Sequence, residues 1–275
     1  MAKDSNGEMS FLEHLEELRW HIVRSAAAVI VLAVIAFIFS GFIFDSILLA
    51  PKNPEFITNR LLCRLGRYVN TEALCINTNS SFMIQNINMA GQFSADIMVS
   101  LIVGVIAAFP YIMWEVWKFI APALYEKERR HAQGSVWAVS ALFLIGAAFG
   151  YFVIVPLSVD FLGGYHASKQ IVNQIALNSY FSTVAYIPLA TGVVFELPLL
   201  MIFLTKVGVV NPGFLEKYRR HAYILLLILA AVITPPDVFS QILVVLPLIL
   251  LFEMSIVMTK RTARKNQQII EHKKS

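Results

Sequence analysis

The candidate chemistry of this sequence is carried by a few acidic residues. Glu17 lies in a polar N-terminal stretch, Glu128 in a charged loop between two apolar segments, and Glu196 inside an otherwise uncharged run. A carboxylate on a basic surface is a natural partner for guanidinium groups, each of which presents a planar fork of N–H donors. A carboxylate within a bilayer costs about 2.5 kcal/mol or more, so Glu196 calls for an explanation.

Motifs of the common enzyme classes are missing from the sequence. It contains no Gly-x-Ser-x-Gly, no His-Glu-x-x-His, no P-loop and no Cys/His set with metal-ligand spacing. The six histidines fall mainly in or beside polar segments, where we expect them to be solvated or interfacial. The sequence therefore predicts no catalytic residue, no metal and no cofactor.

Composition places the chain in a membrane. Of its 275 residues 57% are hydrophobic and only 15% are charged, against about one quarter charged in soluble domains. The charges are segregated and leave long uncharged runs that read as spans of roughly 20 residues. A net charge of +4 then indicates topology and not nucleic-acid binding.

The elements predicted from these runs are all helical. A capping box at Ser10 and Glu13 starts an amphipathic N-terminal helix within residues 1–24, which we expect to lie along the interface before turning into the bilayer. Three uncharged runs follow, then a fourth that is interrupted only by Glu196, and a fifth apolar region that is broken by Thr-Pro-Pro-Asp. The five regions are 25–44, 97–114, 134–159, 180–205 and 222–258.

Basic residues decide how often the last region crosses. Summed over alternate polar segments, Lys and Arg number 17 on one side and 5 on the other, and the richer side is cytoplasmic. Both flanks of 222–258 are then cytoplasmic, so this region crosses twice as two short helices. The prediction is a single all-α domain over 1–275 with six spans, both termini cytoplasmic, an extended external loop at 45–96 and a cytoplasmic tail at 259–275.

Several acidic residues have two readings. Glu196 is about 15 Å from the cytoplasmic end of its span, where it serves either a functional role or an internal hydrogen bond that fixes packing. We expect Glu115 and Glu253, nearer the ends of their spans, to reach water. Glu13 and Glu17 lie four residues apart on the predicted helix, where their like charges repel each other and favour the binding of a cationic ligand. Glu13 also has a structural role, as the glutamate of the capping box.

Four stretches closely resemble one family. They are Phe-Leu-Glu-His-Leu-Glu-Glu-Leu-Arg at 11–19, Trp-Lys-Phe-Ile-Ala-Pro-Ala-Leu-Tyr-Glu-Lys-Glu-Arg-Arg at 117–130, Phe-Glu-Leu-Pro at 195–198 and Thr-Pro-Pro-Asp-Val-Phe-Ser-Gln at 234–241. In order and spacing they resemble TatC, the polytopic core subunit of the twin-arginine protein translocase. The likeness extends over nearly the whole chain and implies a concave helix bundle.

The resemblance also implies site residues. Glu17 and Glu128 would receive the two arginines of a signal peptide, with Arg19 and Phe119 supporting that site. Glu196 would face a groove and meet a polar group of a partner helix. Partner docking would involve Gln241 and the turn formed by Pro235, Pro236 and Asp237.

The resemblance further implies a receptor and scaffold without catalysis. Folded proteins with twin-arginine signal peptides would be bound at the cytoplasmic face of a bacterial inner membrane. Transport would follow by assembly with TatA-type and TatB-type single-span subunits, driven by the proton-motive force. Several copies of the chain are also expected to associate as a homo-oligomer within the complex. No binding of nucleic acid is expected.

The loop at 45–96 departs from the family because it looks longer than the usual first external loop. It holds both cysteines, Cys63 and Cys75, on the predicted external side, where a disulfide between them is one expectation and two unpaired thiols the other.

Two other functions compete with a receptor. An ion-coupled small-solute transporter would use Glu196 as its coupling carboxylate, and a structural assembly subunit would use it only for packing. The transporter predicts further intramembrane charges and internal repeats, and the sequence offers one central glutamate and no evident repeat.

Overall fold

A computed structural model describes residues 11–68, 82–120, 126–166, 168, 173–206, 212–234 and 238–274. Side chains are described over a smaller set, which leaves out those of Glu128, Phe239 and the tail beyond Arg261. Of the predicted site, Glu128 is therefore placed only by its backbone, and Cys75, Pro235, Pro236 and Asp237 lie outside the described residues.

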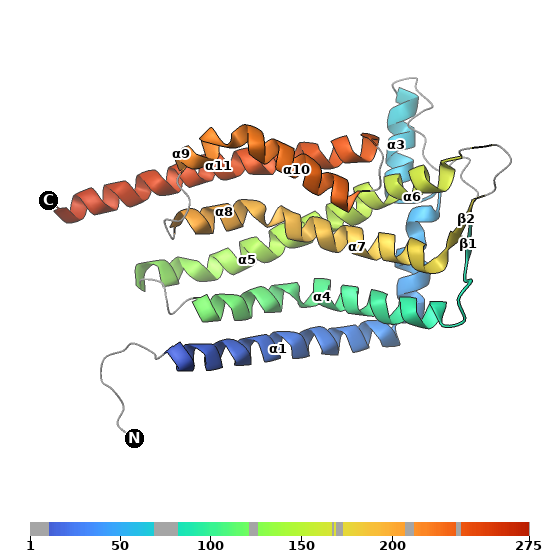
Figure 1. Cartoon of the computed structure of the whole chain (residues 1–275), viewed down its shortest axis with the longest axis horizontal. Helices are drawn as coiled ribbons and strands as arrows, with labels where there is room; N and C mark the ends of the chain where they lie inside the picture. The colour runs from blue at the N-terminus through green and yellow to red at the C-terminus, as the bar shows by residue number, and fades with distance from the viewer. Residues whose placement is uncertain are drawn as a thin grey trace.

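Long helices run side by side along the length of the molecule (Figure 1). They are α1 (Phe11–Ile38), α4 (Gly91–Ile120), α5 (Glu126–Phe149), α6 (Val155–Gly164), α7 (Leu177–Phe195), α8 (Leu197–Lys206), α10 (Arg219–Ile233) and α11 (Val238–Lys274). A π-helical turn, η5 (Gly150–Ile154), joins α5 to α6, and the short α9 (Pro212–Lys217) precedes α10. The first turn of α1 and the last turn of α11 lie at the same end of the bundle (Figure 1).

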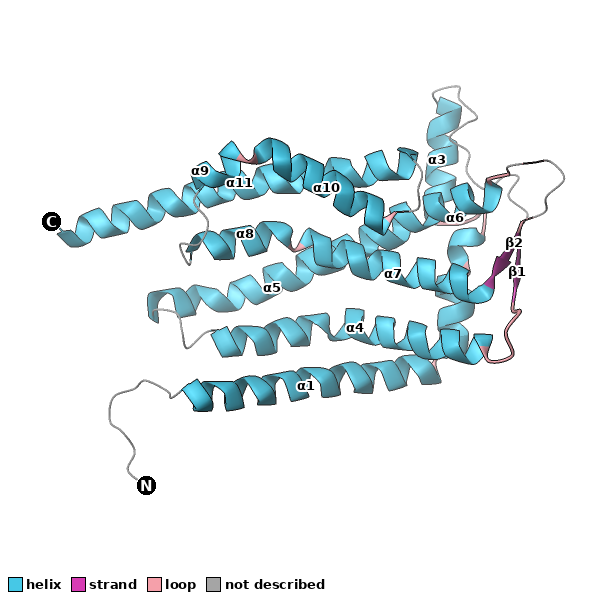
Figure 2. Cartoon of the chain, in the orientation of Figure 1, coloured by secondary structure: helices cyan, strands magenta, loops and turns pink. Residues whose placement is uncertain are grey.

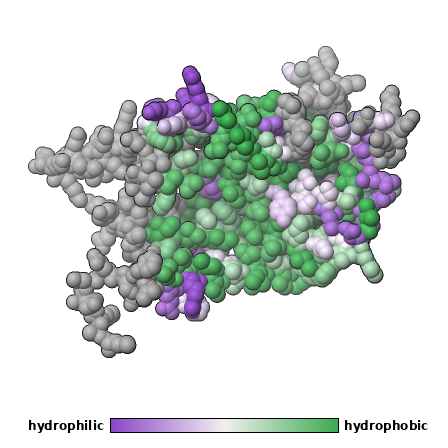
Figure 3. Space-filling view, in the orientation of Figure 1, coloured by the Kyte–Doolittle hydropathy of each residue, from purple (hydrophilic) through white to green (hydrophobic). Residues whose placement is uncertain are grey.

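On the face shown in Figure 3, apolar residues cover the middle of the bundle and hydrophilic residues gather toward its ends. Large apolar side chains of the helices are exposed, for example Ile30, Ile38 and Val232, which suits a surface solvated by lipid. Among the described residues, five helical stretches are long and apolar enough to span a membrane: 15–38, 91–120, 136–164, 177–205 and 241–261. The prediction of an all-α membrane protein is confirmed.

The predicted sixth crossing corresponds to α10. Its 15 residues extend about 22 Å, less than a hydrocarbon core of roughly 30 Å, so it is not among the five. It packs against α11 and runs along the bundle beside it (Figure 1). The count of six spans stays a prediction.

The expected turn between an interfacial helix and the first span is absent. α1 is one continuous helix from Phe11 to Ile38. Residues 20–28 contain neither proline nor glycine and include three alanines in a row, so nothing in this stretch ends a helix that has already begun. The amphipathic N-terminal segment is thus the first part of the spanning helix.

The connection at 45–96 contains more regular structure than an extended loop. The short α2 (Ser40–Phe42) and the start of η1 (Ile43–Leu48) lead into it, and it contains η2 (Ala50–Lys52), α3 (Ile57–Tyr68) and β1 (Met83–Gln85). β1 pairs in parallel with β2 (Gln174–Ala176), so that Ile84 faces Ile175. Figure 2 shows this pair of strands at the end of the bundle opposite the first turn of α1 and the last turn of α11.

Candidate functional site

The buried carboxylate of Glu115 joins α1 to α4. Its side chain is only 1% exposed, and its Oε2 lies 2.6 Å from Nδ1 of His21 on α1. Its Oε1 lies 3.1 Å from Nζ of Lys118, which sits 3.2 Å from the ring centroid of Trp114. The expectation that Glu115 reaches water is wrong, because two basic partners allow the carboxylate to be buried. His21 is likewise paired and not solvated.

This contact brings together two elements of the predicted peptide site. Phe119 meets the ring of His21 edge to face, with centroids 6.1 Å apart. Glu17 lies one helical turn before His21 on the same face of α1, and its side chain is half-buried. Arg19, on another face, is exposed and lies 5.7 Å from the Trp20 ring centroid.

The remaining acid of that site comes from α5, which begins at Glu126, two residues before Glu128. α5 packs against α4, and its first turn lies at the same end of the bundle as the last turn of α4 (Figure 1). The backbone thus places Glu128 at the end of the bundle that also carries Glu17 and Phe119. The arrangement of its side chain toward Glu17 is not described and stays a prediction.

We predict that Glu115→Ala lowers the free energy of unfolding by about 2 kcal/mol, the scale of a lost buried hydrogen bond to a charged group. The change leaves His21 and Lys118 without their shared carboxylate partner at the α1–α4 contact. Thermal unfolding of the purified protein in detergent measures the effect. Glu115→Gln keeps an acceptor for both partners and should lose less; equal stability of all three proteins would contradict the structural role.

Glu196 occupies a break between two collinear helices. α7 ends at Phe195 and α8 begins at Leu197, and the backbone N–H of Glu196 donates to the Val193 carbonyl at 3.1 Å. Pro198 follows two residues later and has no N–H to continue the α-helical pattern. Glu196 is therefore the single residue between the end of α7 and the start of α8.

Close packing of α5 and η5 on α7 holds this break in place. A Cβ added to Gly146 would lie 2.6 Å from Cγ of Phe195, and one added to Gly150 would lie 2.1 Å from Oγ1 of Thr191. Small residues allow such an approach between helices in a membrane. Glu196 is half-buried, and its Oε1 is inaccessible to solvent with no hydrogen-bond partner among the described side chains and backbone.

Gln241 lies near the start of α11, and its Nε2 donates to the Leu227 carbonyl of α10 at 3.4 Å. This contact links the two helices near the predicted docking turn. Pro235, Pro236 and Asp237 themselves are outside the described residues.

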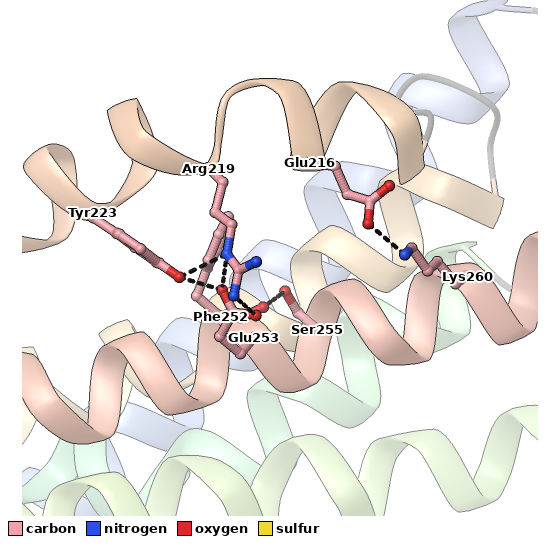
Figure 4. A network of polar contacts seen from close by, with 7 residues as sticks. All are labelled: Glu216, Arg219, Tyr223, Phe252, Glu253, Ser255 and Lys260. Carbon is pink, nitrogen blue, oxygen red and sulfur yellow. Dashed lines mark hydrogen bonds and ion pairs between the residues drawn. The ribbon is translucent and has the colours of Figure 1, made fainter.

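A second polar cluster ties α10 to α11 (Figure 4). Arg219 Nη2 lies 2.5 Å from Oε2 of Glu253, and Tyr223 donates to the same carboxylate. Lys260 on α11 also pairs with Glu216 on α9. Glu253 was expected to reach water, but its main neighbours are these groups.

Comparison with known proteins decides the family. The model of the family described as "Sec-independent protein translocase protein (TatC)" matches residues 13–247. The chain belongs to the TatC family. TatC of Blattabacterium sp. subsp. Periplaneta americana is 39% identical, covering 96% of this chain and 99% of that protein. TatCy of Bacillus subtilis is 30% identical over 98% of this chain and 95% of its own length.

Solved structures agree with this assignment. A crystal structure of the twin-arginine translocase receptor TatC is 31% identical, with a TM-score of 0.69, and the match covers 91% of this chain and 99% of the other. The same receptor crystallised in DDM gives a TM-score of 0.70 at 30% identity. The resemblance inferred from the four motifs is confirmed, and so is the prediction of a protein-transport function instead of an enzymatic one.

Membership in the family does not test the individual site residues. Cys63 is disulfide-bonded, and Cys75 is the only other cysteine of the sequence but lies outside the described residues. Their pairing stays a prediction. Sequence reasoning missed His21 and Glu115 as partners; the signal available was an acid and a base near the cytoplasmic ends of two consecutive predicted spans.

Proposed function

We propose that the chain is the receptor and scaffold subunit of a twin-arginine translocase in a bacterial inner membrane, with six spans and both termini in the cytoplasm. It binds twin-arginine signal peptides of folded proteins at its cytoplasmic face and assembles with TatA-type and TatB-type subunits. Transport uses the proton-motive force. Its likeness to a TatC receptor over 91% of the chain is the observation that supports this most strongly.

The proposed peptide site lies at the end of the bundle where α1 begins, α4 ends and α5 begins, with α4 packed against both of the other helices. Glu17 and Glu128 each receive one guanidinium group, Phe119 packs against the peptide, and Arg19 lies beside the entrance. The His21–Glu115 contact supports this assignment because it fixes the turn of α1 that carries Glu17 against the turn of α4 that carries Phe119. Guanidinium ligands suit such carboxylates because each offers two parallel donors.

Partner subunits are proposed to contact a different region. Glu196 at the α7–α8 break meets a polar group of a partner helix, and Gln241 with the 235–237 turn docks a second one. The buried Oε1 of Glu196 without a described partner supports this, since an unpaired polar atom within a membrane favours any helix that supplies a donor.

The guanidinium requirement tests the proposal most directly. A peptide with the Arg-Arg pair should bind the purified protein about tenfold or more tightly than its Lys-Lys counterpart, because lysine cannot form bidentate pairs with the two carboxylates. Fluorescence titration of labelled peptides in detergent measures both affinities. Equal affinities would remove the proposed site chemistry.

A further inference from the structure

α3 lies outside the bundle and is not used by the proposed transport function. It runs across the direction of the long helices, at the end where α1 finishes (Figure 1). Its first turn is fixed to the bundle: the Thr58 hydroxyl donates to the Phe152 carbonyl, and Phe56 stacks on the Phe152 ring with centroids 5.9 Å apart and planes at 16°. The start of α3 is thereby held against η5.

One side of α3 faces the protein. The Asn59 side chain is buried and donates to the Asn53 carbonyl at 3.0 Å. Gly66, two turns later on the same side, is also buried. These contacts fix which side of α3 faces the protein, and therefore also which side faces outward.

The outward side of α3 is apolar and uncovered. Ile57, Leu61 and Tyr68 share one face at helical spacing and are 56%, 53% and 91% exposed. Such residues on the rim of a membrane protein would contact water unless a lipid surface or another protein covered them.

Arginines flank this apolar face. Arg60, Arg64 and Arg67 recur every three or four residues, all three are exposed, and the helix contains no acidic residue. Arg60 donates to the Glu55 carbonyl at 2.8 Å, while Arg64 and Arg67 have no ion pair with any described residue. Three of the four Lys and Arg between 45 and 96 thus lie on one short helix.

The orientation of α3 indicates whether a lipid surface or another protein covers its apolar face. Because the long helices run along the bilayer normal, a helix lying across them is parallel to the membrane plane. It lies beside η5, at the end of the bundle where α1 finishes (Figure 1) and where hydrophilic residues gather on the face shown in Figure 3. An apolar face beside a row of arginines at that depth matches a helix lying in the headgroup region.

We propose that α3 is an interfacial helix that binds anionic phospholipids in the leaflet at its end of the bundle. Ile57, Leu61 and Tyr68 enter the boundary between headgroups and acyl chains, and the arginines contact lipid phosphates. This inference rests on the chain's spanning a membrane and not on the proposed peptide site, so either can fail without the other.

Lipid photocrosslinking tests the proposal on the full-length protein. A diazirine side chain at Leu61 is activated in nanodiscs of phosphatidylcholine and phosphatidylglycerol, and the adducts are identified by mass spectrometry. We expect adducts enriched in phosphatidylglycerol. The double variant R64Q/R67Q should reduce that enrichment by about fivefold for each arginine removed, the effect of one basic residue near an anionic surface.

A matched variant, K217Q/R261Q, removes two exposed positive charges at the opposite end and should leave the enrichment unchanged. Circular dichroism confirms that both variants are folded. Equal labelling of the two lipids, unchanged in R64Q/R67Q, would overturn the role of the arginines. Adducts to a second copy of the chain, or none to lipid, would overturn the interfacial helix itself.

Discussion

Replacing Glu17 or Glu128 by alanine is expected to weaken binding of a twin-arginine signal peptide by about ten- to a hundredfold, while the chain still inserts into the membrane. Each change removes the acceptor of one charge-assisted pair, whose net contribution is about 1.5–3 kcal/mol. Crosslinking of a signal peptide to the cytoplasmic face, followed against peptide concentration, measures the loss. The two changes together should reduce binding further than either alone.

Neighbouring acids provide matched controls for this experiment. Glu16→Ala removes the same charge from the adjacent residue of α1, which is exposed and lies on another face of the helix. Glu126→Ala does so at the start of α5. Both should leave peptide binding nearly unchanged if position, and not total charge, matters. Unchanged crosslinking in both Glu17→Ala and Glu128→Ala would reject the assigned site.

The proposed peptide site also shows what the sequence could predict. The resemblance to TatC implied Glu17 and Phe119 as site residues, and the structure connects their helical turns through a third residue, His21. That connection was not predictable from one sequence, because the burial of Glu115 depends on which faces of α1 and α4 meet. From sequence alone, a carboxylate near a helix end is predicted to be solvated, because its partners on another helix are not known.

Prediction of the fold was limited for similar reasons. The apolar runs located the long helices because each must satisfy its backbone hydrogen bonds internally. The continuity of α1 was missed because an amphipathic start and an apolar continuation need no break when proline and glycine are absent. The β1–β2 pair was missed because its strands of three residues come from connections some ninety positions apart.

The connection at 45–96 was recognised as unusual by its length, but not by its contents. The strands are too short for an alternation signal, and α3 shows no capping motif at its start. The arginines of α3 were counted only for topology, where they fall on the side with fewer basic residues. Their placement beside exposed apolar residues became visible only with the helix oriented across the bundle (Figure 1).

Replacing Glu196 by alanine is expected to lower export of a twin-arginine substrate by about three- to thirtyfold, the range of one interhelical hydrogen bond in a membrane. Binding of the signal peptide should stay unchanged, because Glu196 lies at the α7–α8 break and the proposed peptide site lies where α1 begins, α4 ends and α5 begins. Export is measured in cells that carry the variant as their only copy, and peptide binding on the purified protein. Glu196→Gln retains a polar partner atom and should preserve most of the export.

Thermal stability separates this role from simple packing. Because Oε1 of Glu196 is buried without a described partner, removing the carboxylate eliminates a desolvated group, and Glu196→Ala should unfold at the same temperature as the natural protein or above it. An internal hydrogen bond that fixes packing predicts the opposite, a less stable variant with proportionately lower export. A stable variant with impaired export therefore points to a contact completed by another helix, and a stable variant with normal export would leave Glu196 without a role in transport.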